Sequence, residues 1–217
     1  MRKLEKLCFL LPLILFLNCN NSPPRVLGNG IIISQERTVP DFSELYLEGS
    51  YVVFIDSSSS DIIEIEGEEN ILPHIRTEKS GSMFKIYPDR SVSCTVPVKV
   101  FMKNENLTGI KIKGTSRIDC KKAEGKVLDV DITGEGQMDL SGNVKRLNID
   151  IDGTGNINAK KLDADSTRIG IDGMGILTVN ANKYLNVKIK GMGNITYYGD
   201  PEIVQKIEGI GSITSGD

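Results

Sequence analysis

The sequence is poor in the side chains on which most catalytic and metal sites depend. Its 217 residues include one histidine and no tryptophan. His74 lies outside any recognisable motif, so a catalytic triad or a zinc site would lack the partners that it needs. We therefore expect His74 to be a surface residue, and we expect a protein that is not an enzyme, with no metal and no cofactor.

Cysteine is scarce, and two of the four cysteines lie in or beside an N-terminal leader. A basic start is followed by an apolar run from Leu7 to Leu17, which is shorter than the roughly 20 residues that a membrane-spanning helix needs. A basic start with a short apolar core is typical of a secretory signal peptide. We assign residues 1–18 to this signal, which would remove Cys8.

Cys19 directly follows the expected signal. The stretch Phe16-Leu17-Asn18-Cys19 resembles a bacterial lipoprotein signal, in which cleavage leaves a cysteine that carries lipid. Phe16 and Asn18 depart from the usual residues, so an ordinary secretory signal is the alternative. Residues 19–30 begin with a polar, proline-containing stretch that suits a tether. The resemblance implies attachment to the membrane through a lipid on Cys19.

Net positive charge is also absent. The formal charge is −3 and residues 1–18 carry +2, so removing them leaves −3 − 2 = −5. This acidity argues against a nucleic-acid partner. The two remaining cysteines, Cys94 and Cys120, fall on the apolar side of alternating stretches and are expected to be small buried side chains. A disulfide between them stays open, because sequence does not give their separation.

Long apolar runs are missing after the leader, and a repeat of alternating residues takes their place. Six units each contain a short alternating stretch, a Gly-x-Gly or related turn and a second short alternation. The leading glycines recur at a nearly constant interval of roughly 19 residues. Glycine at such turns permits positive φ and a tight change of direction. The turn glycines are Gly114, Gly134, Gly136, Gly153, Gly155, Gly173, Gly175, Gly191, Gly193, Gly209 and Gly211.

The repeat predicts the fold. Alternation of apolar and polar residues indicates strands with one buried face, and one unit cannot bury that face alone. Stacked units predict an all-β, parallel β-solenoid, resembling the β-helix of pectin lyases, with rungs about 4.8 Å apart. A meander of antiparallel hairpins is the alternative, and the near-constant period favours the solenoid. The expected inward column is Ile112, Ile132, Ile151, Ile171, Ile189 and Ile207.

The first half of the chain is rich in strands but irregular. We divide residues 31–217 into irregular strands at 31–106 and regular repeats at 107–217. No linker rich in Pro, Gly and Ser separates the two parts, so we expect a single domain. The segment from Glu68 to Pro73 is expected to hold a helical turn.

The opening strands and the repeat together resemble a known family. The segments are Phe42-Ser-Glu-Leu-Tyr-Leu-Glu-Gly49, Ile63-Glu-Ile-Glu-Gly67, Pro97-Val-x-Val, Leu107-Thr-Gly-Ile110 and the Gly-x-Gly series. They are similar to the GIN domain of auto-transporter adhesin heads, a family of exported bacterial β-solenoids. The resemblance covers about residues 31–217. It implies adhesion or surface interaction, and it supplies no catalytic residues.

Acidic side chains recur on the outward side of the middle repeats. They are Asp131, Asp150, Asp152 and Asp172, with Asp129 beside them. Lysines at 111, 113, 188 and 190 border this row. A solvated face explains the row most simply. Contact with a cation or a glycan is a second interpretation, and a polysaccharide-active site of the pectin-lyase type, helped by Arg168 and Lys188, is a third.

The residues between paired glycines suggest a second surface. Met174, Met192 and Ile210 occupy this place in the last three units. They form either an exposed contact ridge or a cover that folds back over the coil ends.

We therefore expect an exported, lipid-anchored, non-enzymatic surface protein of the cell envelope, at the outer membrane or cell surface. It would bind a host, matrix or envelope component or a glycan through a face of the solenoid. The polysaccharide-active enzyme is one alternative. A structural envelope protein that self-associates as a homo-oligomer is another.

Overall fold

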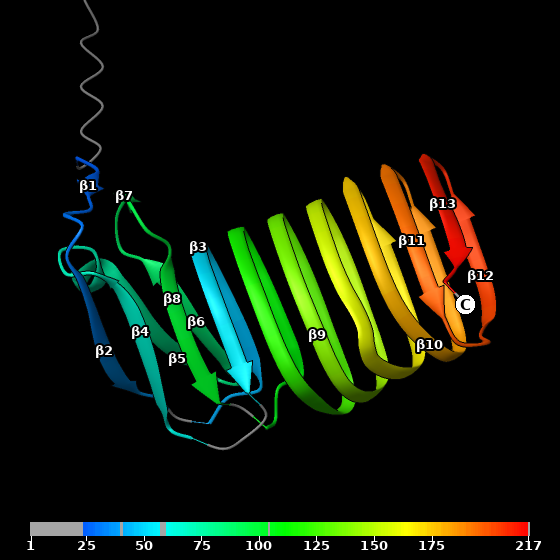
Figure 1. The fold of residues 1–217 in the computed structure, drawn as a ribbon, viewed down its shortest axis with the longest axis horizontal. Helices are drawn as coiled ribbons and strands as arrows, with labels where there is room; N and C mark the ends of the chain where they lie inside the picture. The colour runs from blue at the N-terminus through cyan, green and yellow to red at the C-terminus, as the bar shows by residue number, and fades with distance from the viewer. Residues whose placement is uncertain (1–23, 40, 57–59, 104, 217) are drawn as a thin grey trace, which may run out of the picture.

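The computed structural model describes residues 24–39, 41–56, 60–103 and 105–216 (Figure 1). Nearly all of them form strands, and their only helix is the 3-10 turn η1, Leu72–His74. The all-β class is therefore confirmed, and a helical turn occurs where the sequence predicts one. None of the helical residues in these ranges could cross a membrane. The expected signal peptide and Cys19 lie outside the described residues.

The strands fall into an irregular first group and a regular second group. The first comprises β1 (Val26–Leu27), β2 (Ile32–Thr38), β3 (Glu44–Asp56), β4 (Ile62–Glu68), β5 (Ile75–Ser80), β6 (Met83–Pro88), β7 (Val92–Ser93) and β8 (Val98–Lys103). The second comprises β9 (Gly109–Ile171), β10 (Met174–Ile189), β11 (Met192–Tyr198), β12 (Glu202–Ile207) and β13 (Ile210–Ser215).

One mixed sheet contains most of these strands, in the order β13-β11-β10-β9-β3-β8-β4-β2. The pairs from β3 to β13 are parallel, as is the pair of β10 with β12. Antiparallel pairs occur only toward the N-terminus in the described ranges: β4 with β2 and with β8, and β5 with β6. The repeat does not predict these antiparallel strands, since they precede it.

β9 continues through several turns of the chain. It is 63 residues long, against about 5–6 for an ordinary strand. Its first part pairs with β3 and its last part pairs with β10, so the same strand contributes successive rungs (Figure 1). Parallel partners in the later rungs are one repeat apart in sequence, as in Gly155 with Gly175 and Gly175 with Gly193. These segments are therefore not antiparallel hairpins.

The leading glycine of each turn lies directly against the backbone of the previous turn. A Cβ added at Gly173 would overlap the carbonyl oxygen of Gly153, and one at Gly191 would overlap that of Gly173. The Gly173 carbonyl also accepts a hydrogen bond of 2.7 Å from the amide of Met192. Positive φ occurs at Gly114, Gly134 and Gly153 but not at the later leading glycines. Space for the neighbouring backbone, more than positive φ, therefore requires glycine here.

The second glycine of each turn makes room for the core. A Cβ at Gly155 would meet the Cδ1 atom of Ile151 at 2.5 Å, and one at Gly136 would meet that of Ile132 at 2.6 Å. The predicted inward column is buried from Ile112 through Ile189. Ile207 departs from the prediction, since it is 39% exposed in the last described rung. No later described strand stacks on β12 to cover it.

The N-terminal strands are joined by a buried carboxylate at the end of β4. Glu68 is 1% exposed and accepts hydrogen bonds from the Gly30 amide at 2.7 Å and from the Thr95 amide and hydroxyl at 2.8 Å. Burial alone would raise the pKa of this carboxyl, but these donors and the Val96 amide together lower it. Glu68 thus ties the segment before β2 to the segment before β8.

Substitution of a leading glycine tests the stacking. We expect Gly173→Ala to lower the free energy of unfolding by about 1–3 kcal/mol, because the new methyl group forces apart two hydrogen-bonded turns. Urea denaturation measures this change. Met174→Ala is the matched control, since Met174 is the next residue and is 48% exposed. Equal midpoints for Gly173→Ala and wild type would contradict the steric explanation.

Candidate binding groove

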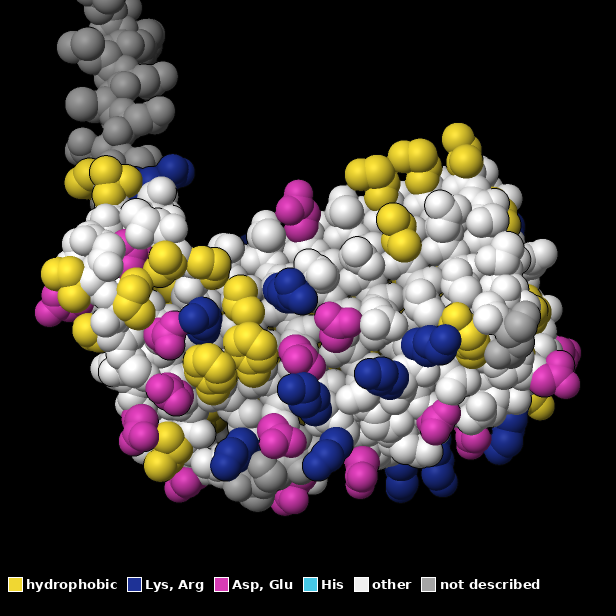
Figure 2. Space-filling model, in the orientation of Figure 1, with side chains coloured by type: hydrophobic (Ala, Val, Ile, Leu, Met, Phe, Trp, Pro, Cys, Tyr) yellow, Lys and Arg dark blue, Asp and Glu magenta, His cyan; other side chains and the backbone are white. Residues whose placement is uncertain are grey.

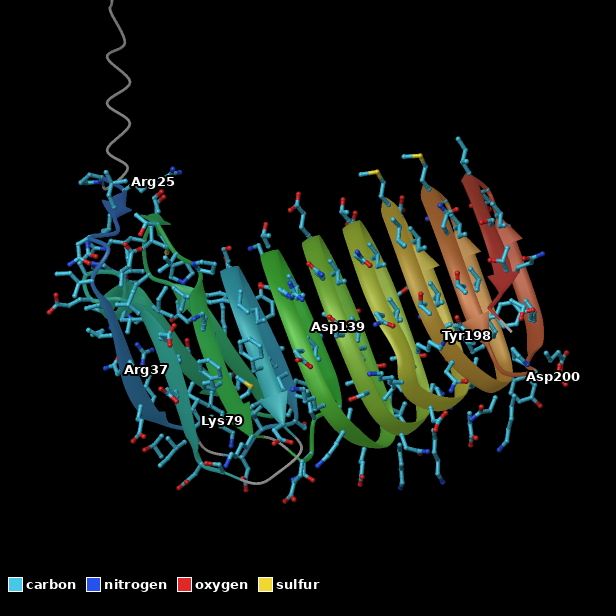
Figure 3. The ribbon with its side chains drawn as sticks, viewed as in Figure 1. Arg25, Arg37, Lys79, Asp139, Tyr198 and Asp200 are labelled. Carbon is cyan, nitrogen blue, oxygen red and sulfur yellow. The ribbon has the colours of Figure 1, made fainter. Side chains whose placement is uncertain are left out.

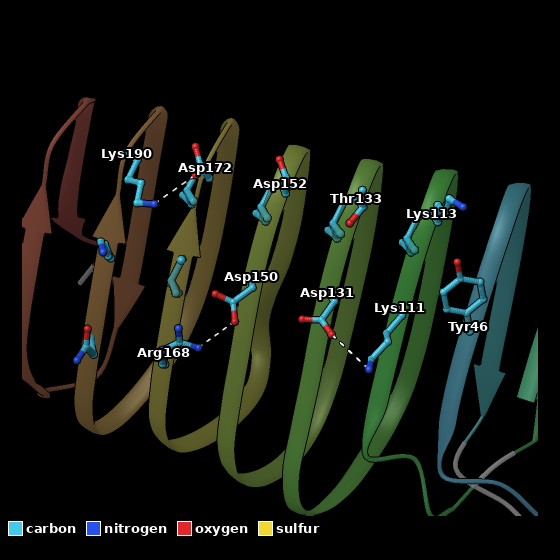
Figure 4. A pocket seen from close by; sticks show the side chains of 18 residues that line it. Tyr46, Lys111, Lys113, Asp131, Thr133, Asp150, Asp152, Arg168, Asp172 and Lys190 are labelled. Carbon is cyan, nitrogen blue, oxygen red and sulfur yellow. Dashed lines mark hydrogen bonds and ion pairs between the residues drawn. The ribbon is translucent and has the colours of Figure 1, made fainter. Parts of the chain in front are cut away.

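Four of the five predicted aspartates lie in one groove. Asp131, Asp150, Asp152 and Asp172 project outward from the segments that precede the glycine turns (Figure 4). The groove has a volume of about 700 Å³ and runs across successive rungs from Tyr46 and the Lys111 rung to the Lys190 rung. Asp129 is not part of its lining, and its carboxylate accepts a hydrogen bond of 2.7 Å from Asn148.

The groove is of mixed charge because basic side chains pair with most of its carboxylates. Nζ of Lys111 is 3.8 Å from Asp131, Arg168 donates to Asp150 at 2.9 Å, and Nζ of Lys190 is 3.4 Å from Asp172 (Figure 4). These pairs connect adjacent rungs, since the two partners of each pair lie about one repeat apart in sequence. Each is exposed to solvent and contributes about 0–1 kcal/mol to stability.

Two charged side chains in the groove have no such partner. Asp152 and Lys188 are both exposed, and neither forms a salt bridge or a hydrogen bond with the side chains that the structure describes; the charge of Lys188 acts only at longer range, on Glu208. The groove thus offers one free carboxylate and one free ammonium group among paired charges. These two are the groups most available to a ligand.

A missing side chain deepens the middle of the groove. Gly170 occupies the outward position that carries Asp150 in the rung before and Lys188 in the rung after. A Cβ at Gly170 would overlap the Oδ1 atom of Asp150. The carboxylate of Asp150 therefore occupies part of this space, where Arg168 reaches it. The backbone of the Gly170 rung forms part of the groove lining as a result.

Asp131 is the groove carboxyl whose protonation is perturbed. Burial raises its pKa, Lys111 opposes that rise, and the carboxylates of Asp150 and Asp129 add to it. The side chain is still 47% exposed and lies near Lys111. This upward shift fits a crowded face that solvent still reaches.

The described residues contain no group of three or more acidic, histidine or cysteine side chains placed to hold a metal ion. Hard cations such as Ca²⁺ take six to eight oxygen ligands. In this groove the carboxylates instead face lysine and arginine across the rungs. The cation interpretation of the aspartate row therefore has no geometric support in the described part of the chain.

The predicted contact ridge is exposed. Met174 pairs in parallel register with Met192, and Met192 pairs with Ile210. Their exposed fractions are 48%, 49% and 74%. Side chains with sulfur atoms project from the turn ends of β10 and β11 in Figure 3. The three side chains therefore form a short line at the edge of the stack and do not fold back over it.

The remaining candidates lie apart from the groove. Cys120 is buried, Cys94 is partly buried, and both are free thiols. Burial raises the pKa of Cys120 to about 12, and the Asp119 charge adds to this, so its thiol stays protonated at neutral pH. His74 is partly exposed and lies 3.1 Å from the carboxylate of Asp89. Cys19 is outside the described residues.

The sequence pattern does not predict which charged side chains of the groove form ion pairs with each other. Aligning the repeats places Asp150 and Arg168 in adjacent rungs, but it offsets them by two positions along the strand. The long arginine side chain reaches back diagonally, aided by the space at Gly170. The glycine at an outward strand position was the signal that could have revealed this contact.

Comparison with known proteins identifies the family. The model of the family described as "Putative auto-transporter adhesin, head GIN domain" matches residues 41–201. This range includes the groove and most of the described strands. No curated protein matches the chain.

Solved structures share the fold at low sequence identity. A putative adhesin from Bacteroides fragilis NCTC 9343 has a TM-score of 0.66 and 22% identity, over 88% of this chain and 99% of that one. A putative adhesin from Parabacteroides distasonis ATCC 8503 has a TM-score of 0.61 and 18% identity, over 88% and 100%. A putative lipid binding protein from the same organism has a TM-score of 0.51 and 22% identity, over 89% and 100%.

Calcium addition tests the charge pairing in the groove. We expect millimolar Ca²⁺ to leave the melting temperature unchanged, because lysine and arginine already neutralise Asp131, Asp150 and Asp172. Differential scanning calorimetry with matched concentrations of NaCl and CaCl₂ measures the effect. A saturable rise in melting temperature that Asp152→Asn abolishes would show that the groove binds the cation after all.

Proposed function

Because the chain belongs to the family of GIN-domain heads of auto-transporter adhesins, we propose that it is a non-enzymatic surface protein that binds its partner through the charged groove. The family match supports a role in adhesion. The groove supports a binding surface, because it extends over several rungs and presents groups of both charges to solvent. The partner is a host, matrix or envelope component or a glycan.

The single observation that carries this proposal is the pair of unpartnered charges in the groove. Asp152 and Lys188 are exposed among neighbours that already have partners. Both groups face solvent, so both are accessible for hydrogen bonds to a ligand. A polar ligand with both donors and acceptors matches them.

The alternative of a polysaccharide-active enzyme receives less support. General acid or base catalysis needs a carboxyl positioned to exchange a proton with a substrate. Asp150 and Asp172 instead face Arg168 and Lys190, and Asp131 faces Lys111. These ion pairs leave the three carboxylates facing basic side chains of the protein, which suits positioning a ligand better than exchanging protons with a substrate.

We also infer that residues 31–217 form one open β-solenoid domain. The parallel register of β9, β10, β11 and β13, with partners one repeat apart, supports the repeated coil. One continuous cluster of buried side chains, extending from Val39 to Ile195, supports a single domain. The antiparallel strands β2 and β4 would then close the N-terminal end of the coil.

The N-terminal residues indicate how the protein is attached to the membrane. We infer that residues 1–18 are a signal peptide, that Cys19 carries lipid and that residues 19–30 form the tether. The described chain begins beside β1 and β7, at one end of the stack (Figure 1). An anchor attached there would leave the length of the groove open to the surroundings.

Metabolic labelling tests the anchor. We expect a clickable palmitate analogue to label the full-length protein expressed in a bacterial host, and Cys19→Ser to abolish the label, because the thiol is the attachment point. Cys8→Ser is the matched control, since Cys8 would leave with the signal. Equal labelling of wild type and Cys19→Ser would refute lipidation at this residue.

An adhesion assay tests the groove. Cells that display the full-length protein are allowed to settle on panels of immobilised glycans and matrix proteins. We expect at least one surface to retain them, and we expect Asp152→Lys with Lys188→Glu to weaken retention by about tenfold or more, equivalent to ~1.4 kcal/mol. Neither substitution breaks an ion pair that the structure describes, so the fold should persist.

The control for this assay is Asn156→Lys, an exposed position on the opposite side of the coil. We expect it to retain cells as wild type does. Retention that is no greater than for cells without the protein would contradict the proposal. Cleavage of a polysaccharide that Asp150→Asn with Asp152→Asn abolishes would assign the enzyme instead.

A further inference from the structure

Two phenylalanines lie side by side on the outer surface of the sheet, away from the groove. Phe54 of β3 and Phe101 of β8 are register partners, and their rings stack with centroids 5.0 Å apart and planes 9° apart. Phe54 is 36% exposed. Figure 2 shows hydrophobic side chains gathered over the ends of β3 and β8. The sheet therefore carries an aromatic surface at this place.

The same outward row is polar in every later rung. Phe54 pairs with Asp119, and farther along the row Asn158 pairs with Thr178, which pairs with Thr196. Asp139 belongs to this row (Figure 3), and its carboxylate accepts a hydrogen bond of 3.1 Å from Asn158 in the next rung. The described positions of this row in the later rungs are thus polar, and the phenylalanine pair departs from that pattern, as a contact surface for a partner would.

The rings line a hollow of about 410 Å³. That volume lies within the range of about 300–1,000 Å³ typical of sites for small ligands. Ile62, which is 45% exposed, adds to the apolar lining. The charged residues of the lining are Glu36, Asp56, Glu64, Lys103, Asp119 and Lys121. An apolar floor with a polar rim is the usual composition of a ligand site.

The rim has more hydrogen-bond acceptors than donors. It contains four carboxylates and two ammonium groups, and Lys121 is already 3.6 Å from Asp119. Glu64 accepts a hydrogen bond of 2.5 Å from Ser34, whereas Glu36 and Asp56 have no partner among the described side chains. A ligand here must therefore donate hydrogen bonds, and the excess of negative charge disfavours an anion.

The apolar lining and the excess of carboxylates distinguish between the classes of ligand that could bind in the hollow. Acidic glycans and anionic lipid surfaces would be repelled by the four carboxylates. A second copy docking through the same hollow would bring like charges together, because a two-fold contact places the same patch on both subunits. A sugar ring instead has an apolar face of C–H groups and a rim of hydroxyl donors, which matches the phenyl rings and the carboxylates.

We propose that this aromatic hollow, lined by Phe54, Phe101, Ile62 and Asp56, binds an uncharged or amine-bearing sugar residue. The C–H face of the sugar packs against the phenyl rings, and its hydroxyl or amine groups donate to Asp56 and Glu36. The site lies across the core from the charged groove, because Phe54 follows the turn at Gly49 whereas the groove residues precede their turns. It therefore does not depend on the function proposed for the groove.

A purely structural role for the ring pair predicts a different result. Aromatic pairs across neighbouring strands stabilise a sheet by about 0.2–1 kcal/mol each. In that case Phe54→Ser would lower stability and no sugar would bind to the wild type. Direct binding measurements on the folded protein therefore separate the two roles.

The experiment is a calorimetric titration of the full-length protein, held in a detergent that has no sugar headgroup, with defined trisaccharides. One set ends in neutral hexose or N-acetylhexosamine, a second in glucosamine and a third in an acidic sugar. We expect the first or second set to bind and the third not to bind. We expect Asp56→Asn to weaken binding by about tenfold and Phe54→Ser to abolish it.

The variants separate binding from folding. Asp56→Asn leaves both rings in place, so its effect tests the site even if Phe54→Ser does not fold. Asn156→Lys should bind the sugars as wild type does, because this exposed residue lies outside the lining of both the hollow and the groove. No binding by any trisaccharide, binding of the acidic set alone, or binding that Asp56→Asn and a folded Phe54→Ser leave unchanged would each overturn the proposal.

Discussion

Successive turns of this chain approach each other so closely at each bend that only glycine fits between them. The carbonyl oxygen of one leading glycine lies where the Cβ of the next would be, as for Gly153 and Gly173. The same carbonyls accept hydrogen bonds from the following turn, as Gly173 does from Met192. Regular strand spacing is thus maintained through the corner, where a larger residue would separate the two backbones. The parallel register on both sides of each turn depends on this contact.

Because the inward positions provide the packing, the outward positions are free to differ. Ile132, Ile151 and Ile171 are each at most 2% exposed, and the second glycines leave room for their Cδ1 atoms. The residues beside them alternate outward and carry the charges of the groove. On the other side of the core the same freedom places Phe54 and Phe101 next to acidic residues. The parallel rungs of one sheet therefore support two surfaces of different chemistry.

Much of this arrangement was predictable from the repeat, because residues at equal places in a parallel stack have equal surroundings. The burial of Ile132, Ile151 and Ile171 and the alignment of Met174 with Met192 follow directly from the spacing. The antiparallel strands β2 and β4 did not follow, because they lie outside the periodic part. The contact of Arg168 with Asp150 depends on side-chain reach, which spacing does not encode. The exposure of Ile207 reflects its place in the last described rung, where the average environment of a repeat no longer applies.

In the repeated part of the described chain, the parallel register pairs each rung only with the rungs beside it. Duplication of one unit would therefore add about 4.8 Å to the stack without altering contacts elsewhere. Its outward residues could then diverge freely as long as the two glycines and the inward isoleucine were kept. Such an architecture can lengthen its binding surface through duplication of single units and can change the residues of that surface through point mutations. Selection can therefore adjust the length of the binding surface one rung at a time.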